Sequence, residues 1–196
     1  MALSEWLCRS NTNDIVIFEV DPLKAIQNKN AYQTDNNNIF GALIGEVGGI
    51  YISSIVRIFG STSNGNLRDI YDWNEKFGCS SYIIIGDDIY GGIFAINLTL
   101  KNINPGDICY YAPETLIWEG LGVTLVSFFN FLKNGDLLKF YSNICLEKYM
   151  KIQKKQIPFN KTLSIYPPQW SSEFKTSNWS YKEIDSEQYT KAMLIG

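Results

Sequence analysis

The sequence predicts a single domain, residues 1–196, in which helices and β-strands are mixed. Three observations lead to this prediction. The chain has 196 residues, 45% of them hydrophobic and 14% aromatic, so it can bury one substantial core. Apolar runs rich in Ile, Val, Phe and Tyr alternate with glycine-containing turns, which is typical of strands. Other segments repeat apolar residues at helical spacing behind a capping residue.

The N-terminal part predicts two helices and one strand. Residues 3–7 have the apolar spacing of a short amphipathic helix. The apolar run 15–20 predicts a short strand. Asp21 and Pro22 are typical of a helix N-cap and first helical position, so we expect a helix that continues to about Tyr32.

The segment 39–60 predicts two or three strands joined by tight turns, with a hairpin at residues 48–49. Within it, Arg57 shares a strand face with Ile55 and Phe59. A charge in that position indicates either an edge strand or a buried ion pair.

The centre of the chain predicts one helix followed by three strands. Residues 67–77 carry an apolar stripe at helical spacing, and Asn64 or Asn66 can cap this helix. The strands are expected at residues 81–85, 93–98 and 108–112, with turns at 87–92 and 102–107.

The C-terminal part predicts two more helices and an extended tail. Thr124 can cap an apolar helix through Leu132, and Asp136 can cap a second helix that runs toward Lys151. The tail from Gln156 onward contains several prolines and tryptophans. We expect it to be extended and packed by aromatic side chains.

The composition excludes several classes of function. The chain has no histidine, so mechanisms that need a Ser-His pair, a Cys-His pair or a histidine-bound metal cannot operate. The formal net charge of −3 gives no attraction to nucleic acid or to an anionic membrane, and we expect neither as a partner. The basic cluster 148–155 is explained by the C-terminal end of a helix rather than by RNA binding.

The N-terminal residues lack the pattern of a signal peptide, and no apolar run approaches the about 20 residues needed to span a bilayer. We therefore expect a cytoplasmic protein. The cysteines Cys8, Cys79, Cys109 and Cys145 are dispersed, without any Cys-x-x-Cys pair. In a reducing compartment such thiols are expected to be small buried hydrophobes rather than zinc ligands. No cofactor or metal is expected.

Asp87 and Asp88 are the most distinctive candidate site residues, because they precede the glycine pair Gly91 and Gly92 in an acidic turn. Neighbours on a strand point to opposite faces, so the two carboxylates cannot act together on one substrate. They are explained either by turn formation, which Asp and Gly favour, or by an acidic contact with a partner at the rim of the sheet.

Glu114, Trp118 and Glu119 form a second candidate group, since an acidic pair beside an indole suits a sugar or a basic side chain. On an extended chain the two glutamates would lie roughly 15 Å apart. Glycosidase carboxylates are separated by only about 5 to 10 Å. The glutamates therefore do not form a catalytic pair by themselves, although one of them could face Asp88 across the strands.

The blocks 88–97 and 111–119 resemble an uncharacterised bacterial family, domain-of-unknown-function family 2625. Further motifs agree in order and spacing over residues 39–170: Gly48-Gly49-Ile50, Val56 to Ser61, Asp72-Trp73-Asn74, Gly135-Asp136-Leu137 with Phe140-Tyr141, and Ile165 to Trp170. That family is in turn similar to the SUKH superfamily. The resemblance implies an α+β fold, with a twisted, mostly antiparallel sheet and helices packed on one side.

SUKH proteins commonly serve bacteria as immunity proteins, so the resemblance implies a non-catalytic protein that neutralises a toxin by direct binding. A negative net charge suits a basic toxin. The expected contact residues are Asp87, Asp88, Glu114, Trp118 and Glu119. One alternative is a histidine-free enzyme that uses the same carboxylates on a small molecule or carbohydrate. Another is a housekeeping interaction module, with a homodimer formed through an edge strand near Val56.

Overall fold

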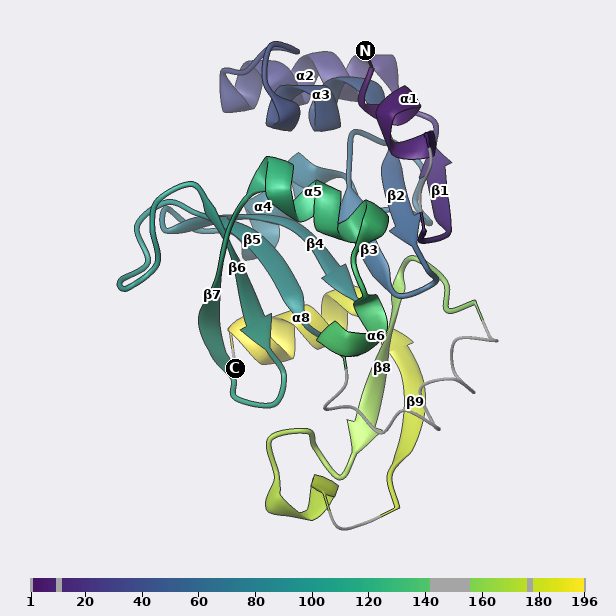
Figure 1. Ribbon diagram of the computed structural model, residues 1–196, viewed down its shortest axis with the longest axis vertical. Coiled ribbons are helices and arrows are strands. Elements are labelled where there is room, and N and C mark those ends of the chain that lie inside the picture. The colour runs from purple at the N-terminus through teal and green to yellow at the C-terminus, as the bar shows by residue number, and fades with distance from the viewer. Residues whose placement is uncertain (1, 10–11, 142–155, 176–177, 196) are drawn as a thin grey trace.

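Figure 1 shows a computed structural model of the protein, which describes residues 2–9, 12–141, 156–175 and 178–195. Its main element is a seven-stranded sheet in which the strands follow one another in chain order and every neighbouring pair is antiparallel. The strands are β1 (Ile15–Phe18), β2 (Gly49–Ile52), β3 (Val56–Phe59), β4 (Tyr82–Asp88), β5 (Ile93–Asn97), β6 (Asp107–Ala112) and β7 (Ile117–Thr124). The predicted mixture of helices with an antiparallel sheet is confirmed.

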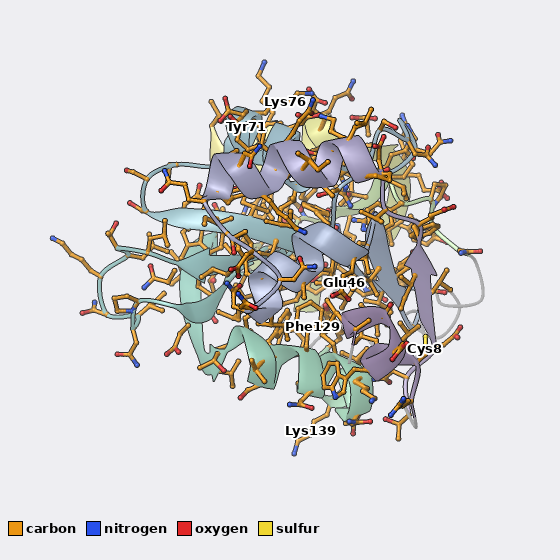
Figure 2. All side chains as sticks on the ribbon, turned by 90° about the horizontal axis from the view of Figure 1, so that it is seen from above. Cys8, Glu46, Tyr71, Lys76, Phe129 and Lys139 are labelled. Carbon is orange, nitrogen blue, oxygen red and sulfur yellow. The ribbon has the colours of Figure 1, made fainter. Side chains whose placement is uncertain are left out.

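The helices of the described residues lie on both sides of this sheet. They are α1 (Leu3–Cys8), α2 (Pro22–Tyr32), α3 (Ile39–Glu46), α4 (Ile70–Phe77), α5 (Leu125–Asn134), α6 (Leu137–Phe140) and α8 (Ser186–Leu194), with a 3-10 helix η1 (Ser172–Lys175). Figure 2 shows α4, with Tyr71 and Lys76, on one side of the sheet and α5, with Phe129, on the other.

The prediction that helices pack on one side is therefore wrong, because the middle strands need cover on both faces. Ile58 and Phe59 are consecutive in β3 and point to opposite faces, yet both have 0% exposure. Ile84 and Ile85, which are consecutive in β4, likewise both have 0% exposure. Continuous apolar runs are typical of strands that are buried on both faces.

Several helix starts are set by local capping, as the sequence predicts. Asp21 Oδ1 accepts hydrogen bonds from the backbone N–H groups of Leu23 and Lys24 at 2.9 and 3.2 Å. Thr124 and Asp136 likewise cap α5 and α6. Each side chain satisfies N–H groups that have no partner within the helix.

The start of α4 differs from the prediction. The carboxylate of Asp69 accepts from the N–H groups of Tyr71 and Asp72, both at 3.0 Å, so the helix begins at Ile70 rather than near residue 67. Asn64, the predicted cap, instead accepts from the N–H of Asn66 within the preceding turn.

Residues 39–46, predicted as strand, form helix α3, which is capped by Asn38 through a 2.8 Å bond from the Gly41 N–H. A short apolar run fits a buried strand and a buried helix equally well, so the cap decides between them. The turn between β2 and β3 lies at Ser53 and Ser54, with φ of 49° and 56°, rather than at residues 48–49. Two left-handed residues are typical of a tight hairpin turn.

The C-terminal tail has more structure than predicted. Strands β8 (Lys161–Tyr166) and β9 (Ser180–Asp185) pair as an antiparallel ribbon that extends from the body of the protein (Figure 1). Leu163 ties this ribbon to the 88–92 turn, because its N–H donates to the Ile89 carbonyl at 2.8 Å. Asp185 caps α8, a helix that was not predicted from the sequence. The predicted continuation of a helix toward Lys151, with Cys145 and the basic cluster 148–155, lies outside the described residues.

The edges of the seven-stranded sheet are β1 and β7, whereas β3 pairs with both β2 and β4. The prediction of an edge strand near Val56 is therefore wrong. Strand β7, the other edge, was not predicted, because the last strand expected in this part of the chain was the one at residues 108–112.

Of the described cysteines, Cys109 is buried, while Cys8 and Cys79 are exposed. The prediction of buried thiols therefore holds for Cys109 and fails for the other two. Within the ranges given above, no helix is both long and apolar enough to span a bilayer.

Candidate functional site

The two adjacent aspartates of β4 point to opposite faces of the sheet and are both buried. Asp87 is 4% exposed and Asp88 0%. Each carboxylate has its own set of partners, described below. Neither lies at the surface, so the predicted contact of these two residues with a partner is not compatible with this geometry.

Asp87 is held by two arginines. Its Oδ1 accepts from Arg57 Nε at 2.7 Å and from Arg68 Nη2 at 2.8 Å, and its Oδ2 accepts from Arg68 Nη1. The Arg57 guanidinium also donates to five other acceptors among the described residues: the carbonyls of Asp88, Pro158, Phe159 and Lys161 and the hydroxyl of Thr162. The expected buried ion pair at Arg57 is confirmed. Through these bonds Arg57 joins β3 and β4 to the start of the C-terminal ribbon.

The guanidinium of Arg68 lies among aromatic rings, with its central carbon 4.4 Å from the Phe59 ring centroid, 5.0 Å from Trp73 and 5.2 Å from Phe159. Burial lowers the pKa of Arg68 to about 10, so the group stays charged at neutral pH. Such a stacked and paired cation stabilises a particular packing arrangement, and it becomes costly when its carboxylate is removed.

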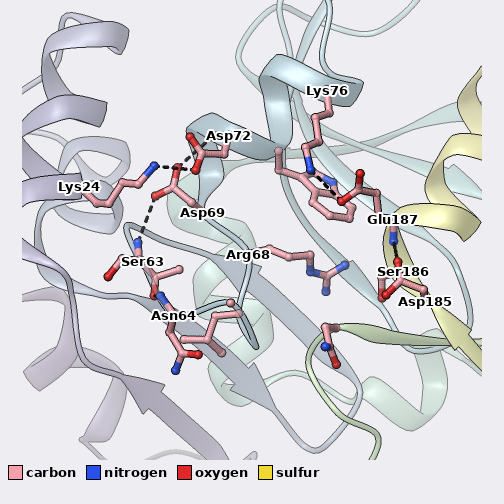
Figure 3. A pocket seen from close by; sticks show the side chains of 15 residues that line it. Lys24, Ser63, Asn64, Arg68, Asp69, Asp72, Lys76, Asp185, Ser186 and Glu187 are labelled. Atoms are coloured by element: carbon pink, nitrogen blue, oxygen red, sulfur yellow. Dashed lines mark hydrogen bonds and ion pairs between the residues drawn. The ribbon is translucent and has the colours of Figure 1, made fainter.

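Arg68 also lines the polar cleft, a hollow of about 420 Å³ (Figure 3). The cleft lies between α2, the 62–69 loop, α4 and the start of α8. Two ion pairs cross it, Lys24 to Asp72 at 2.6 Å and Lys76 to Glu187 at 2.8 Å.

The two other carboxylates of the polar cleft also have partners. Asp69 accepts from N–H groups of α4 and from Asn28, and Asp185 accepts from N–H groups of α8. The cleft thus combines both signs of charge in pairs, and its charges do not select one class of ligand.

Asp88 organises the turn that follows β4. Its Oδ1 accepts from the N–H groups of Tyr90 and Gly92 at 2.8 and 3.0 Å. Its Oδ2 accepts from the hydroxyls of Tyr110 and Tyr141 at 2.8 and 3.0 Å. Burial raises the pKa of Asp88 to about 6, although these hydrogen bonds oppose the shift.

Gly91 and Gly92 are required in this turn because two tyrosine side chains pack directly against their Cα atoms. A Cβ atom at Gly92 would overlap the Tyr110 ring, and one at Gly91 would overlap Tyr189. Gly91 also has φ of +97°, a conformation that side chains disfavour. The turn-forming explanation of these residues is therefore well supported.

Beside the Asp88 network, a smaller hollow of about 180 Å³ opens at the surface. We call it the acidic pocket, and its lining residues are Tyr110, Ala112, Glu114, Glu119, Leu121, Phe140 and Tyr141. Among these described residues there is no Lys or Arg. Partial burial raises the pKa of Glu114, and the nearby charge of Glu119 adds to this shift. Uncompensated negative charge at a concave site favours a cation.

Two predicted site residues, Glu114 and Glu119, are brought together in this pocket. The expectation of roughly 15 Å assumed an extended chain, but the chain reverses between β6 and β7. Leu116 has φ of 58°, and its N–H donates to the Ala112 carbonyl at 2.8 Å. Thr115 then donates to Glu119 Oε1 at 2.8 Å across this turn.

Trp118 points to the opposite face of the sheet and does not line the acidic pocket. Its ring lies 4.5 Å from Tyr82 and 5.4 Å from Tyr111, and it is half-buried. The two pocket tyrosines, Tyr110 and Tyr141, were not identified from sequence. They are 22 and 53 positions from Asp88, so no local pattern relates them to it.

The fold and this site define a single-domain protein of mixed α/β structure, with a seven-stranded antiparallel sheet and an acidic pocket beside one edge strand. The chain belongs to the family described as "Protein of unknown function DUF2625", which matches residues 1–188.

Two similar proteins have been found in bacteria, and both are described as uncharacterised. One from Haemophilus influenzae is 30% identical over 174 residues, which cover 85% of this chain and 75% of that protein. The other is YbfG of Escherichia coli K12, 30% identical over 171 residues, which cover 86% of this chain and 78% of YbfG. No solved structure matches the chain.

Proposed function

We propose that the protein is a non-catalytic binding protein that holds a basic side chain of a partner protein in the acidic pocket. The observation that carries this proposal is the pairing of Glu114 and Glu119 at one open hollow, without a basic residue among the lining residues described. The two carboxylates are solvent-exposed, so they are available to a partner.

The size of the acidic pocket favours a side chain over a free metabolite. Its volume of about 180 Å³ is below the roughly 300–1,000 Å³ that is typical of small-molecule sites. An arginine suits its surfaces, because a planar guanidinium can donate to both glutamates while it stacks on Tyr110 or Phe140.

The roles of the buried aspartates support a binding function rather than catalysis. Every carboxylate oxygen of Asp87 and Asp88 accepts hydrogen bonds from within the protein. These are the most buried carboxylates of the motif blocks, and both stabilise the structure that carries the pocket.

The partner that we propose is a basic bacterial toxin, which the protein neutralises by binding in the cytoplasm. The SUKH resemblance suggests this role, and the negative pocket is complementary to a basic surface. Such complementarity speeds association and selects against acidic partners.

A second candidate function is catalysis without histidine, and one observation favours it. Glu114 lies in a concave pocket and its pKa is raised, as that of a general acid must be. Asp88, with a pKa of about 6, lies behind the same pocket. A small molecule or saccharide that raises the melting temperature of the wild type, but not of Glu114→Gln, would favour the enzyme.

The experiment that tests the binding function compares three tagged proteins in lysate from a bacterium that encodes the chain. They are the wild type, Glu114→Gln/Glu119→Gln, and the control Glu5→Gln/Glu19→Gln, which removes the same charge from exposed positions outside the pocket. Captured proteins are quantified by mass spectrometry at low and moderate salt.

We expect one partner to be captured by the wild type and the control, with at least a roughly tenfold loss in the pocket variant, as for a hydrogen-bonded charge pair. Expression of that partner alone should arrest growth, and co-expression of the wild type should restore it. Equal capture by the pocket variant would overturn the assignment of this pocket. A captured partner whose expression does not arrest growth would support the acidic pocket as a binding site but would contradict the proposal that the partner is a toxin.

A further inference from the structure

A second hollow without basic lining residues lies on the α4 side of the sheet. We call it the tyrosine pocket, and its lining residues are Tyr32, Tyr71, Asn74, Glu75, Gly78, Cys79, Tyr82 and Ile83. Its volume is about 310 Å³, at the lower end of the range for small-molecule sites. It lies between the end of α2, the outer part of α4 and the start of β4, and it shares no residue with the acidic pocket.

We propose that the tyrosine pocket binds an organic ammonium ion, with the aromatic rings as walls and Glu75 as counter-ion. Tyr32 and Tyr71 lie 5.8 Å apart between ring centroids, with their planes at 82°. Two perpendicular rings form a corner, and Tyr82 contributes a third wall. Rings in such an arrangement attract quaternary ammonium groups through their electron-rich faces.

The charge of the pocket has the sign that a cation requires. Glu75 is exposed and makes no ion pair with any residue that the structure describes. It lies close to Tyr71, since its charge raises the pKa of that phenol. A bound cation would therefore find, beside the aromatic hollow, one carboxylate that no described Lys or Arg neutralises.

The walls are held in place before any ligand arrives. Asn74 bridges α4 and β4, because its Nδ2 donates to the carbonyls of Ile70 and Ile84 at 2.8 and 2.7 Å, and its Oδ1 accepts from the Ile84 N–H at 2.8 Å. Tyr32 is packed edge-on against Phe40 at 5.3 Å. A rigid site loses little conformational entropy on binding.

Choline is the first probe, and 3,3-dimethylbutan-1-ol is its matched control, because it has the same shape without the charge. Binding to the wild-type protein is measured by calorimetry. We expect choline to bind more tightly than the alcohol by about fivefold to thirtyfold, which is the usual strength of a cation–π contact. Equal affinities, or no binding of choline at millimolar concentration, would overturn the proposal.

The cysteines provide an internal control for the location. Cys79 lines the tyrosine pocket, whereas Cys8 is exposed elsewhere, on α1. Saturating choline should slow alkylation of Cys79 by iodoacetamide severalfold and leave Cys8 unchanged, as resolved by peptide mass spectrometry. Equal effects on the two thiols would place the choline outside this pocket.

Two variants test the groups that we assign. Glu75→Gln removes the counter-ion at an exposed position, and Tyr71→Ala removes one wall. We expect each to weaken choline binding by about fivefold or more, while Glu5→Gln leaves it unchanged. Full choline affinity in Glu75→Gln would exclude the role of this carboxylate. A trimethyl-lysine peptide, tested beside choline, distinguishes a modified protein from a free metabolite as the source of the ammonium group.

Discussion

Arg57 and Asp87 are directly opposite each other on β3 and β4, and their side chains form an ion pair of 2.7 Å in the interior. Arg57 has 0% exposure and Asp87 has 4%. The same carboxylate also binds Arg68, which lies near the start of α4. One carboxylate thus connects two central strands and a helix that covers them.

Replacement of Asp87 by Asn should strongly destabilise the protein. Two guanidiniums would then remain buried without a counter-ion, and loss of one partner of a buried pair costs about 3–5 kcal/mol. The free energy of unfolding is measured by urea titration with tryptophan fluorescence. Asp72→Asn is the control, because it breaks an ion pair whose carboxylate side chain is 55% exposed, and it should cost less than about 1 kcal/mol. Similar losses in the two variants would contradict a central role for the Asp87 network.

Asp88 should make stability depend on pH between 5 and 7. Its pKa is about 6 in the folded protein and 3.8 ordinarily, so the folded state binds more protons within this window. For this group the free energy of unfolding therefore rises as the pH falls, by about 1 kcal/mol from pH 7 to pH 5.

The measurement for this pH effect compares the wild type with Asp88→Asn, which cannot titrate but keeps an acceptor for the Tyr90 and Gly92 N–H groups. Urea titrations at pH 5 and pH 7 give the difference in stability between the two proteins. Relative to Asp88→Asn, we expect the wild type to be more stable at pH 5 than at pH 7 by about 1 kcal/mol in the free energy of unfolding. Parallel pH profiles would show that Asp88 stays ionised throughout.

Gly92→Ala should disturb the hydrogen bond between Tyr110 and Asp88. The added Cβ atom would overlap the Tyr110 ring, and forced overpacking costs about 1–3 kcal/mol. Gly65→Ala is the matched control, because a Cβ there meets no atom within 4 Å. The melting temperatures of the two variants and of the wild type are measured by thermal unfolding, followed by circular dichroism. A Gly92→Ala protein as stable as the control would mean that Tyr110 moves aside without cost.

The double variant Glu114→Gln/Glu119→Gln should keep wild-type stability. Both residues are exposed and neither forms an ion pair with a described Lys or Arg, so we expect a change within about 0.5 kcal/mol in urea titration. This result is needed to interpret a loss of partner capture as loss of contact. A drop of more than about 1 kcal/mol would instead assign these glutamates a structural role.

The fold was predictable from sequence where the determinants are local. The caps Asp21, Thr124 and Asp136 were identified correctly, because a capping side chain bonds to N–H groups two or three residues away. Helix α3 was missed because its short apolar run fits two structures. The cover on both faces was missed because the one-sided arrangement was taken from the SUKH resemblance, although a continuous apolar run such as that of β4 is itself typical of a strand buried on both faces.

For the candidate site, the residue types follow from the sequence alone: an acidic turn with a glycine pair, two glutamates beside a tryptophan, and no histidine. It also determined that Asp87 and Asp88 point apart, since strand geometry alternates side chains. Three features depend on the three-dimensional packing: both aspartates are buried, Glu114 and Glu119 share a pocket, and Trp118 faces away from it. The physical reason is that burial and proximity come from contacts between distant segments, such as the 53 positions that separate Asp88 from Tyr141.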